Sequence, residues 1–559
     1  MKERKKRSSR SFLLSWKSWF FYIIILLLVA ALTFSTLRLF FKDGSNSKLV
    51  ESLFSPAVFS GESSVSPAIF IQETIIFPEQ IIFFLKYPQS TTSLITRDNV
   101  NCIYMSSNTL SEPELKLPVI SVDGDDSGGL MIRCPLPPRG MIVSLAGKSN
   151  GKYRVLSISQ HKNYDSVIVS GVMMTWDSLA YDALIDSDNT TIVFVKGLNL
   201  RGGKIYDPSK FKCVYGHQDL DKSKFLLRSD VFSIGQEIVR CETPLSVLRN
   251  SSRYKVSVRV VGRRTMDTIA RPLLRFEHDL SGRKLSEMCV CTMLRNQAKF
   301  LKEWVMYHGR IGVEKWIIYD NNSDDDLESV IESLVEGNYN VTRHVWPWIK
   351  SQEAGFAHCA LRARGMCRWV GFIDVDEFIH LPSSPTLIDV IGNDTYVNDT
   401  VGEIRVPCRS FGPSGLNQSP VEGITIGYTC RVHGFERHKS IIRPEALNST
   451  LINVVHHFHL RQGFESISLN SWLMVINHYK YQVWEVFKEK FQRRVATYVA
   501  DWQHDKNVGS KDRAPGLGTT AIEPLDWSQR FCDIEDKSLR DKVLEIFYDP
   551  KIDGLPWQQ

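Results

Sequence analysis

The body of this chain has almost no net charge, although its 559 residues together carry +6. Residues 1–18 contain seven lysines and arginines against one glutamate, so this short tail accounts for the whole excess. A nucleic-acid-binding domain gathers basic side chains on a folded face, and the rest of the chain has no surplus to gather. The sequence therefore excludes nucleic acid as a partner.

The chain also lacks a second long apolar run after residues 19–37. That run contains no charged residue, and as a helix it would span roughly 28 Å, close to the thickness of a thin bilayer core. A cleaved signal peptide would have a shorter apolar core and a small-residue cleavage site. Because the basic flank stays cytosolic, we predict a cytosolic tail at 1–18, a transmembrane signal-anchor at 19–37 and a lumenal remainder, which is a single-pass type II protein.

No C-x-x-C pair is present to form a structural zinc site, although the chain has eleven cysteines. An oxidising lumen permits disulfides, and the odd number leaves at least one cysteine unpaired within the chain. Cys289 and Cys291 alternate along a predicted strand and so share one of its faces. Eight N-x-S/T sequons agree with a lumenal location.

The lumenal part divides into three regions by composition and pattern. Residues 38–95 are rich in Ser and Pro between short apolar runs and indicate a stem. Residues 96–280 contain short alternating segments separated by turn signals, which predict a β-rich accessory domain, a β-sandwich, either a scaffold or a carbohydrate-binding module. Residues 284–545 alternate strand and helix patterns and predict an α/β layered catalytic domain. The predicted elements of that domain are strands at 288–293, 315–319, 341–346 and 369–373 and helices at 298–311 and 352–367.

A pair of carboxylates follows the last of these strands. Asp374 and Asp376 are two residues apart in an extended segment, so both side chains point the same way. Open α/β sheets place their sites at the carboxyl ends of strands. Two hard oxygen ligands without a complete protein cage suit a divalent ion that leaves positions for a phosphate, such as that of a nucleotide diphosphate-sugar.

A second acidic segment, residues 320–326, follows the strand at 315–319. It is not an EF-hand loop, because Asp325 and Ile331 stand where Gly and Glu are required. Asp320 is the candidate for a contact with a base or ribose, and Asp324 to Asp326 are expected to cap the helix at 327–334. A glycan on Asn321 would block such a site, so we expect its sequon to be unused.

Several blocks in order resemble glycosyltransferase family 92. They are residues 288–296, 300–308, 318–323, 371–378, 411–415, 438–444, 477–480 and 512–516. The resemblance covers 284–545, and the last block and the basic anchor are similar to plant members of the family, among them the β-1,4-galactan synthases.

The resemblance implies a GT-A-type fold, a nucleotide-sugar donor and a divalent metal, manganese. It implies transfer of a hexose, galactose from UDP-galactose, with inversion. Asp374 and Asp376 would then hold the ion with His478 as a third ligand, and His456, His457 and His459 are rivals for that place. On the same pattern the nucleotide-sugar-binding residues would be Thr292, Arg295, Asn296 and Asp320, with Lys480 and Arg494 as candidates for stabilising the diphosphate.

Inverting transfer also needs a general base close to the acceptor hydroxyl. Glu377, Glu403, Glu422 and Glu436 are candidates that the sequence does not rank. We therefore expect a Golgi-membrane glycosyltransferase that acts on a cell-wall polysaccharide or a glycoprotein glycan. Two alternatives are a membrane-tethered, non-catalytic glycan-binding protein and a metal-dependent hydrolase, and the hydrolase would need more metal ligands near Asp374 than the sequence offers.

Overall fold

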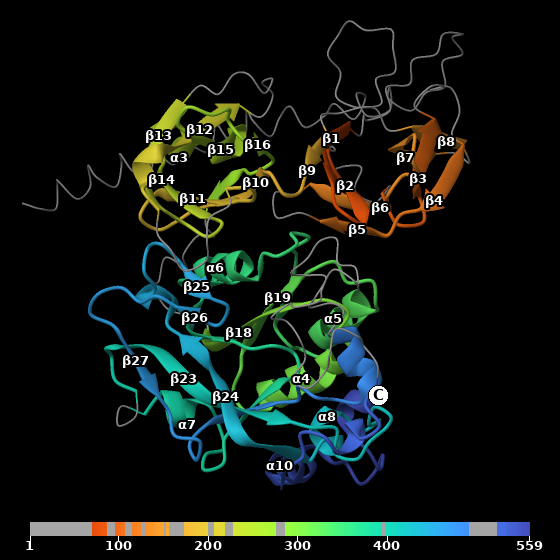
Figure 1. Cartoon of the computed structure of the whole chain (residues 1–559), viewed down its shortest axis with the longest axis vertical. Helices are drawn as coiled ribbons and strands as arrows, with labels where there is room; N and C mark the ends of the chain where they lie inside the picture. Colours follow the sequence, from red (N-terminus) through yellow and green to blue (C-terminus); the bar gives the residue numbers. More distant parts are fainter. Residues whose placement is uncertain are drawn as a thin grey trace, which may run out of the picture. The chain divides into compact units, whose positions relative to one another are not determined.

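The computed structural model describes residues 70–86, 95–106, 114–124, 129–149, 152–155, 173–198, 206–217, 227–274, 286–393, 397–490 and 523–559 (Figure 1). The chain divides into two compact units, 1–66 and 67–559, and all described residues belong to the second. The predicted tail (1–18) and signal-anchor (19–37) lie outside the described residues. Among the helices that are described, none is long and apolar enough to cross a membrane.

The first part of the accessory region is built from two antiparallel sheets. One has the strand order β5-β6-β2-β1-β9, where β9 pairs parallel with β1, and the other has the order β4-β3-β7-β8. A disulfide between Cys102 of β3 and Cys134 of β6 joins the two sheets over a shared apolar core. The strands are β1 Phe70–Ile76, β2 Gln80–Lys86, β3 Val100–Ser106, β4 Leu115–Pro118, β5 Ser121–Gly124, β6 Leu130–Pro135, β7 Met141–Ser149, β8 Lys152–Val155 and β9 Met173–Thr175.

One sequence-based boundary and the expected number of β units change here. Residues 70–86 were expected in the stem, but they form β1 and β2, whose alternate apolar side chains are buried in the accessory core. The region also contains two β units instead of one sandwich, because the strands after β9 form a sheet of their own (Figure 1).

The second β unit is an eight-stranded sheet with the order β15-β12-β13-β14-β11-β10-β16, and β17 pairs with β10. It encloses its own apolar cluster, and a disulfide between Cys213 and Cys241 joins β12 to β14. Its elements are β10 Leu179–Ile185, β11 Thr190–Val195, β12 Phe211–His217, β13 Leu227–Gly235, β14 Ile238–Glu242, α3 Leu245–Arg249, β15 Tyr254–Val260, β16 Asp267–Thr268 and β17 Pro272–Leu274.

The third region is a mixed α/β layer around a ten-stranded sheet: eight strands have the order β20-β19-β18-β21-β24-β23-β28-β22, β27 pairs with β23 and β29 pairs with β24. The first four strands are parallel, and β24 continues the sheet antiparallel to β21. Strands β25 and β26 form a separate two-stranded sheet. Each strand and helix predicted between 284 and 373 is present within a few residues of its expected bounds. The strands are β18 Ser286–Leu294, β19 Lys315–Asp320, β20 Val341–Val345, β21 Cys367–Phe372, β22 Glu377–His380, β23 Val401–Phe411, β24 Cys430–Ile442, β25 Asn453–Val454, β26 His457–Phe458, β27 Glu465–Ser468, β28 Val475–His478 and β29 Ile534–Glu535.

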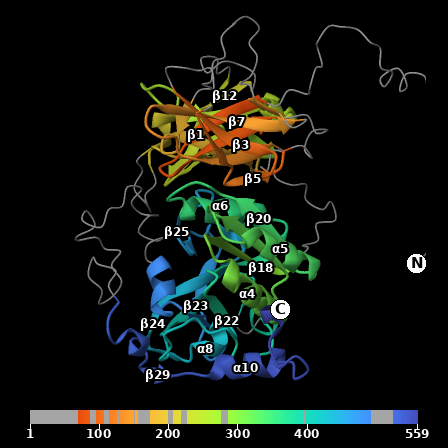
Figure 2. The same cartoon turned by 90° about the vertical axis from the view of Figure 1, so that its right-hand side faces the viewer.

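Helices cover both faces of the parallel strands, which explains why β18 reads as a nearly continuous apolar run. Met288 and Val290 pack in the same cluster as helix α4, whereas Cys289 and Cys291 pack in the cluster that contains α6. In both views α4 and α6 lie on opposite sides of β18 (Figure 2). The helices of this region are α4 Ala298–Arg310, α5 Leu327–Glu336, α6 Gln352–Ala363, α7 Ile388–Ile391, α8 Ile424–Gly427 and α10 Ser538–Phe547.

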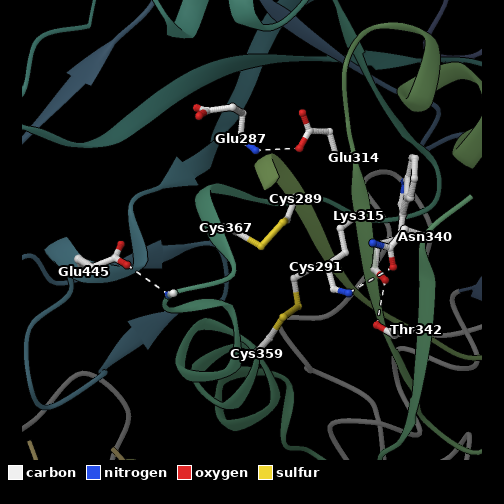
Figure 3. The surroundings of a disulfide bond; sticks show 12 residues. Glu287, Cys289, Cys291, Glu314, Lys315, Asn340, Thr342, Cys359, Cys367 and Glu445 are labelled. Atoms are coloured by element: carbon white, nitrogen blue, oxygen red, sulfur yellow. Dashed lines mark hydrogen bonds between the residues drawn. A yellow bond between two sulfur atoms is a disulfide. The ribbon is translucent and has the colours of Figure 1, made fainter. Parts of the chain in front are cut away.

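Two disulfides fasten β18 on the α6 side (Figure 3). Cys289 bonds to Cys367 of the neighbouring β21, and Cys291 bonds to Cys359 of α6. The shared face predicted for Cys289 and Cys291 is therefore confirmed. Of the eleven cysteines, ten are paired, the last pair being Cys430–Cys532, and Cys408 is free and buried.

Candidate active site

The predicted carboxylate pair lies in a tight turn between β21 and β22. The side chain of Asp374 is 32% exposed and that of Asp376 is 6% exposed. Glu377 closes the turn from both sides: its N–H donates to the Asp374 carbonyl (3.0 Å), and its Oε2 accepts from the Asp374 N–H (3.0 Å). The strand β21 therefore delivers both aspartates to one fixed place at the carboxyl end of the parallel sheet.

Two lysines from distant segments reach these aspartates. Lys439 of β24 places its Nζ 3.6 Å from Asp374 Oδ2 and 2.5 Å from Glu377 Oε1. Lys490, in the helical segment 484–490, contacts Asp376 Oδ2 through its Nζ. Burial raises the pKa of both aspartates, but the two ammonium groups outweigh it and hold each pKa below its usual range. Both carboxylates are thus ionised at neutral pH, as metal ligands must be.

His478 stands between two carboxylates. It is the last residue of β28 and pairs with Glu377 in the sheet. Its Nε2 lies 3.5 Å from Asp376 Oδ2, and its Nδ1 lies 3.2 Å from Oε2 of Glu436 in β24. Burial lowers the pKa of His478, but the neighbouring carboxylates of Asp376 and Glu377 raise it well above the usual value. The histidine preferred from the sequence is therefore beside the aspartate pair.

The rival histidines have other surroundings. His456 is nearly buried: its Nδ1 is 2.9 Å from the Phe372 carbonyl and its Nε2 is 2.7 Å from Lys439 Nζ, which leaves Asp374 Oδ2 3.9 Å away. Burial and Lys439 lower its pKa to about 3. His457 faces Ser440 and Glu403, and His459 is exposed.

The glutamates predicted as candidates for the general base differ in burial and in their partners. Glu377 is fully buried and held by Lys439. Glu436 is 28% exposed and contacts both His478 and Lys480 Nζ, the latter at 2.5 Å. Burial raises the pKa of Glu436, but His478 and Lys480 outweigh it and hold the pKa far below its usual range. Glu422 is an exposed residue just before α8, and its backbone carbonyl accepts from Trp557 Nε1.

Three side chains of α4 hold the strand that follows the carboxylate turn, a role that the sequence analysis missed. Trp304 Nε1 donates to the Glu377 carbonyl (2.9 Å) and Tyr307 Oη donates to the Ile379 carbonyl (2.6 Å). His308 Nε2 accepts from the Ile379 N–H (3.2 Å) while its Nδ1 donates to the Trp304 carbonyl (2.7 Å). The apolar stripe of α4 predicts that these side chains are buried. It does not show that their polar atoms also hold the backbone of β22.

The residues expected at the nucleotide end come from β18 and the loop after it. Thr292 is buried on β18, and its Oγ1 has no hydrogen-bond partner among the described residues. Arg295 lies 3.5 Å from Asp324, and Asn296, at φ 53°, receives a hydrogen bond from the Asp324 N–H on its Oδ1. Lys480 is paired with Glu436, and Arg494 lies outside the described residues.

The acidic segment 320–326 is occupied by structural contacts. Asp320 Oδ2 accepts from Arg343 Nε (3.0 Å) and Nη2 (2.7 Å), and its Oδ1 accepts from the Ser323 N–H (2.9 Å). Asp325 accepts from the Ala298 N–H (2.8 Å), which caps α4, whereas Asp326 at the start of α5 makes no side-chain cap. The expectation that these acids cap the helix at 327–334 through their side chains is therefore wrong for Asp325 and Asp326.

The side-chain amide of Asn321 also makes hydrogen bonds within the protein. Its Nδ2 donates to the carbonyls of Trp346 (2.7 Å) and Trp348 (3.1 Å), which uses both amide hydrogens. These contacts favour an unused sequon.

The chemistry of the donor set fits a divalent ion in part. Asp376 Oδ2 and His478 Nε2 are spaced as two ligands of one ion are, and Asp374 is beside them in the turn. In the part of the chain that the structure describes, these three do not form a group whose ligand atoms all lie within 4.8 Å, although Cys408, Glu436 and His478 do. Since Lys490 contacts Asp376 Oδ2, an ion there would take the place of that ammonium.

Sequence comparison identifies the family. Residues 284–510 match the family described as glycosyltransferase family 92. A protein of Ricinus communis described as a glycosyltransferase family 92 protein is 54% identical over 575 aligned residues, 100% of both chains. This chain belongs to glycosyltransferase family 92. A second family 92 protein, from Oryza sativa subsp. japonica, is 48% identical and covers 88% of this chain and 83% of its own.

Other relatives are more distant from this family 92 glycosyltransferase. A beta-1,4-galactosyltransferase of Caenorhabditis elegans is 24% identical over 263 residues, which are 44% of this chain and 60% of that protein. The glucosyl-3-phosphoglycerate synthase of Mycobacterium tuberculosis, solved with Mn2+, UDP and glucosyl-3-phosphoglycerate, is 14% identical with a TM-score of 0.20 over 38% of this chain and 79% of its own. A TM-score this low supports no conclusion on fold or ligand.

Proposed function

We propose that this family 92 glycosyltransferase has a GT-A-type catalytic domain and is metal-dependent, with manganese as the ion. It transfers a hexose, galactose from UDP-galactose, with inversion, onto a cell-wall polysaccharide or a glycoprotein glycan. It acts as a single-pass type II protein of the Golgi membrane. The observation that carries the metal-dependent part is that His478 Nε2 lies 3.5 Å from Asp376 Oδ2, with the partly exposed Asp374 two residues away in the same turn. The galactose part rests on the partial likeness to the nematode galactosyltransferase.

Each side chain has a definite task in this proposal. Asp374, Asp376 and His478 would hold the ion, whose positive charge offsets the negative charge of the donor diphosphate. Lys490 must release Asp376, and His478 must lose its proton, before either binds the ion. Lys439 stays with Glu377 and keeps one positive charge beside the carboxylates.

Glu436 orients His478 in this arrangement. A metal-binding histidine commonly donates its second ring N–H to a carboxylate, which fixes the ring, and Glu436 Oε2 is 3.2 Å from His478 Nδ1. The variant Glu436→Gln is expected to weaken manganese binding by roughly 10–100-fold, the usual effect of losing such a partner. The activity of this variant should return at high manganese. If it stays low at saturating metal, Glu436 acts on the acceptor instead, and Glu422→Gln is the control that should leave both quantities unchanged.

The donor is tested with the full chain purified in detergent. UDP-galactose, UDP-glucose and UDP-N-acetylglucosamine are offered with manganese, with and without β-galactan oligosaccharides, and released UDP is measured. We expect UDP-galactose to be turned over, to depend on manganese, and to be consumed faster with the oligosaccharides. Turnover of another donor alone would overturn the galactose assignment.

Complete inactivity with every donor would favour the glycan-binding alternative if calorimetry also detected no nucleotide binding. Full activity in the presence of a chelator would reject the metal-dependent part.

A further inference from the structure

A second group of metal-binding side-chain types lies away from the carboxylate turn. Glu403 of β23, His438 of β24 and His457 of β26 each offer one ligand atom, and these atoms all lie within 4.8 Å of one another. Two imidazoles and one carboxylate form a ligand set that suits zinc. All three residues belong to strands, so the backbone holds them in place.

This group is on the opposite face of β24 from the candidate active site. Contacts assign the faces: the His438 ring lies 4.1 Å from the ring of His457, and Ser440 contacts Glu403 and His457, whereas Lys439 contacts Asp374 and Glu377. Strict alternation is broken by a register shift between the Val406–Lys439 and Cys408–Glu436 pairs, and Glu436 faces His478 of the candidate active site. The neighbouring histidines divide in the same way: His456 contacts Lys439, and His457 contacts Ser440. The two groups of ligands are therefore separate.

Glu403 is held as an oriented, ionised ligand. It is 1% exposed; its Oε1 accepts from Ser440 Oγ (2.6 Å), and its Oε2 accepts from Ser466 Oγ (2.5 Å) and Arg405 Nε (3.0 Å). Burial raises its pKa, but hydrogen bonds from His457, Ser440 and Ser466 outweigh it and lower the pKa to about 2. Because Arg405 uses Oε2, Oε1 keeps a lone pair on the side of the histidines.

The two histidines are close enough to share an ion with it. Their ring centroids are 4.1 Å apart, and His457 Nδ1 is 3.6 Å from Glu403 Oε1. Two ligands at about 2.0–2.1 Å from a tetrahedral zinc ion are roughly 3.4 Å apart, which is close to that spacing. Burial and the neighbouring His457 lower the pKa of His438 to about 4, so its ring is neutral. Two positive charges lie near His438 and would repel a cation: Arg405 and the exposed Arg437.

We propose that Glu403, His438 and His457 bind a zinc-class transition-metal ion at a site separate from Asp374, Asp376 and His478. Three protein ligands leave one tetrahedral position for water. The ion would fasten β26 to β23 and β24. Since His456 precedes β26 and contacts the Phe372 carbonyl, this clip would also steady the end of β21 from which the carboxylate turn starts.

The test measures zinc binding by the full chain in detergent. The protein is stripped with a chelator, zinc is returned against a chromogenic competitor, and bound zinc is counted by mass spectrometry. Wild type is expected to bind one ion that Asp376→Asn also binds. Ser466→Ala should weaken that binding by about 10–100-fold, because it removes a partner that orients Glu403. His438→Asn and His457→Asn should weaken it further, and cobalt in the wild-type site should show the visible absorption of a tetrahedral ion.

Two comparisons keep the proposal falsifiable. Zinc should raise the melting temperature of wild type and Asp376→Asn but not of the two histidine variants, which separates a lost site from a lost fold. Arg405→Gln removes a competing cation and should bind zinc at least as tightly as wild type. Absence of zinc in wild type, or equal affinity in His438→Asn, His457→Asn and wild type, would overturn the proposal. These measurements of zinc binding and melting temperature do not use the activity assay. They can therefore be interpreted even if the proposed transferase function is wrong.

Discussion

Two acidic segments follow β19 and β21, the two parallel strands on either side of β18, and they do opposite things. The turn after β21 presents Asp374 and Asp376 to lysines and a histidine that come from distant strands and a distant helix. The loop after β19 uses its acids within the scaffold, on Arg343, on a loop N–H and on the start of α4. Similar residue types at similar positions thus make structural contacts in the loop after β19, whereas the turn after β21 is the one for which we propose metal binding.

The difference lies in the partners. Lys490 reaches Asp376 from the helical segment at 484–490 and is 36% exposed, so it can move aside when a stronger cation arrives. Arg343 is fixed between Asp320 and Asp123 of the accessory region, at 2.7 and 2.9 Å, and has no such freedom. An acid is available for a ligand when its counter-ion can leave, and the sequence spacing of acids does not report this.

The sharpest test of the comparison is Asp376→Asn. We expect transfer activity to fall by at least about 100-fold, because an ion ligand that offsets transition-state charge is lost. The free energy of unfolding should also fall, but by less than in Asp320→Asn, because the partly exposed Lys490 can return to water while His478 loses a carboxylate partner. Steady-state turnover and urea unfolding of the same preparations measure the two effects.

The matched control is Asp324→Asn in the other segment, where the side chain is 45% exposed. It should keep activity within a few-fold of wild type. If Asp376→Asn and Asp324→Asn lose equal transfer activity, the acids of the two segments do not differ in their role.

The reverse pattern is expected for Asp320→Asn. Removing one partner of a buried ion pair costs about 3–5 kcal/mol, and the lower end applies here because Arg343 keeps Asp123 and Glu328. The loss should appear in urea unfolding, while turnover per folded molecule stays near wild type. If instead stability is kept and the KM for the donor rises, Asp320 contacts the nucleotide, as the family resemblance implies.

The four parallel strands of the ten-stranded sheet could be predicted from sequence, because they are buried between helices that each carry one apolar stripe, but the strands after residue 373 were not predicted. The position of the aspartate pair could be predicted because periodicity locates the strand before it, whereas His478 was proposed only from the family resemblance, and the structure places it 3.5 Å from Asp376. Periodicity could not show that Trp304, Tyr307 and His308 bond the backbone of β22, since their stripe reads as core. It also could not show that Asp325 caps a helix 27 residues earlier in the chain, because that contact depends on how β18 and β19 are paired.

The hydrogen bonds between α4 and β22 predict that the free energy of unfolding falls in acid. The aspartate turn does not predict this fall. Burial lowers the pKa of His308 to about 3, and both ring nitrogens are used in the neutral form, one as donor and one as acceptor. The unfolded chain takes up this proton near pH 6.5, so stability falls as pH drops from 6.5 towards 3. Between pH 6.5 and 5 the loss is about 2 kcal/mol.

His308→Gln keeps one donor and one acceptor but does not titrate. The difference between its stability and that of wild type, measured by urea unfolding from pH 7 to 5, isolates this group from the other buried histidines. Parallel curves for the two proteins would show that His308 does not control the acid response.

The smallest effect separates two adjacent acids of the structural segment. Asp325→Ala removes the carboxylate that accepts from the Ala298 N–H and should cost about 1 kcal/mol, the usual value of a helix N-cap. Asp326→Ala, at the start of α5, should cost less than about 0.5 kcal/mol, because Asp326 makes no side-chain cap there. Because α4 holds β22 next to the carboxylate turn, Asp325→Ala should also raise hydrogen exchange at the Ile379 amide, whereas Asp326→Ala should not. If Asp326→Ala lowers the free energy of unfolding more than Asp325→Ala does, these acids stabilise α5. That is the result that the sequence predicts, because the acids lie just before that helix.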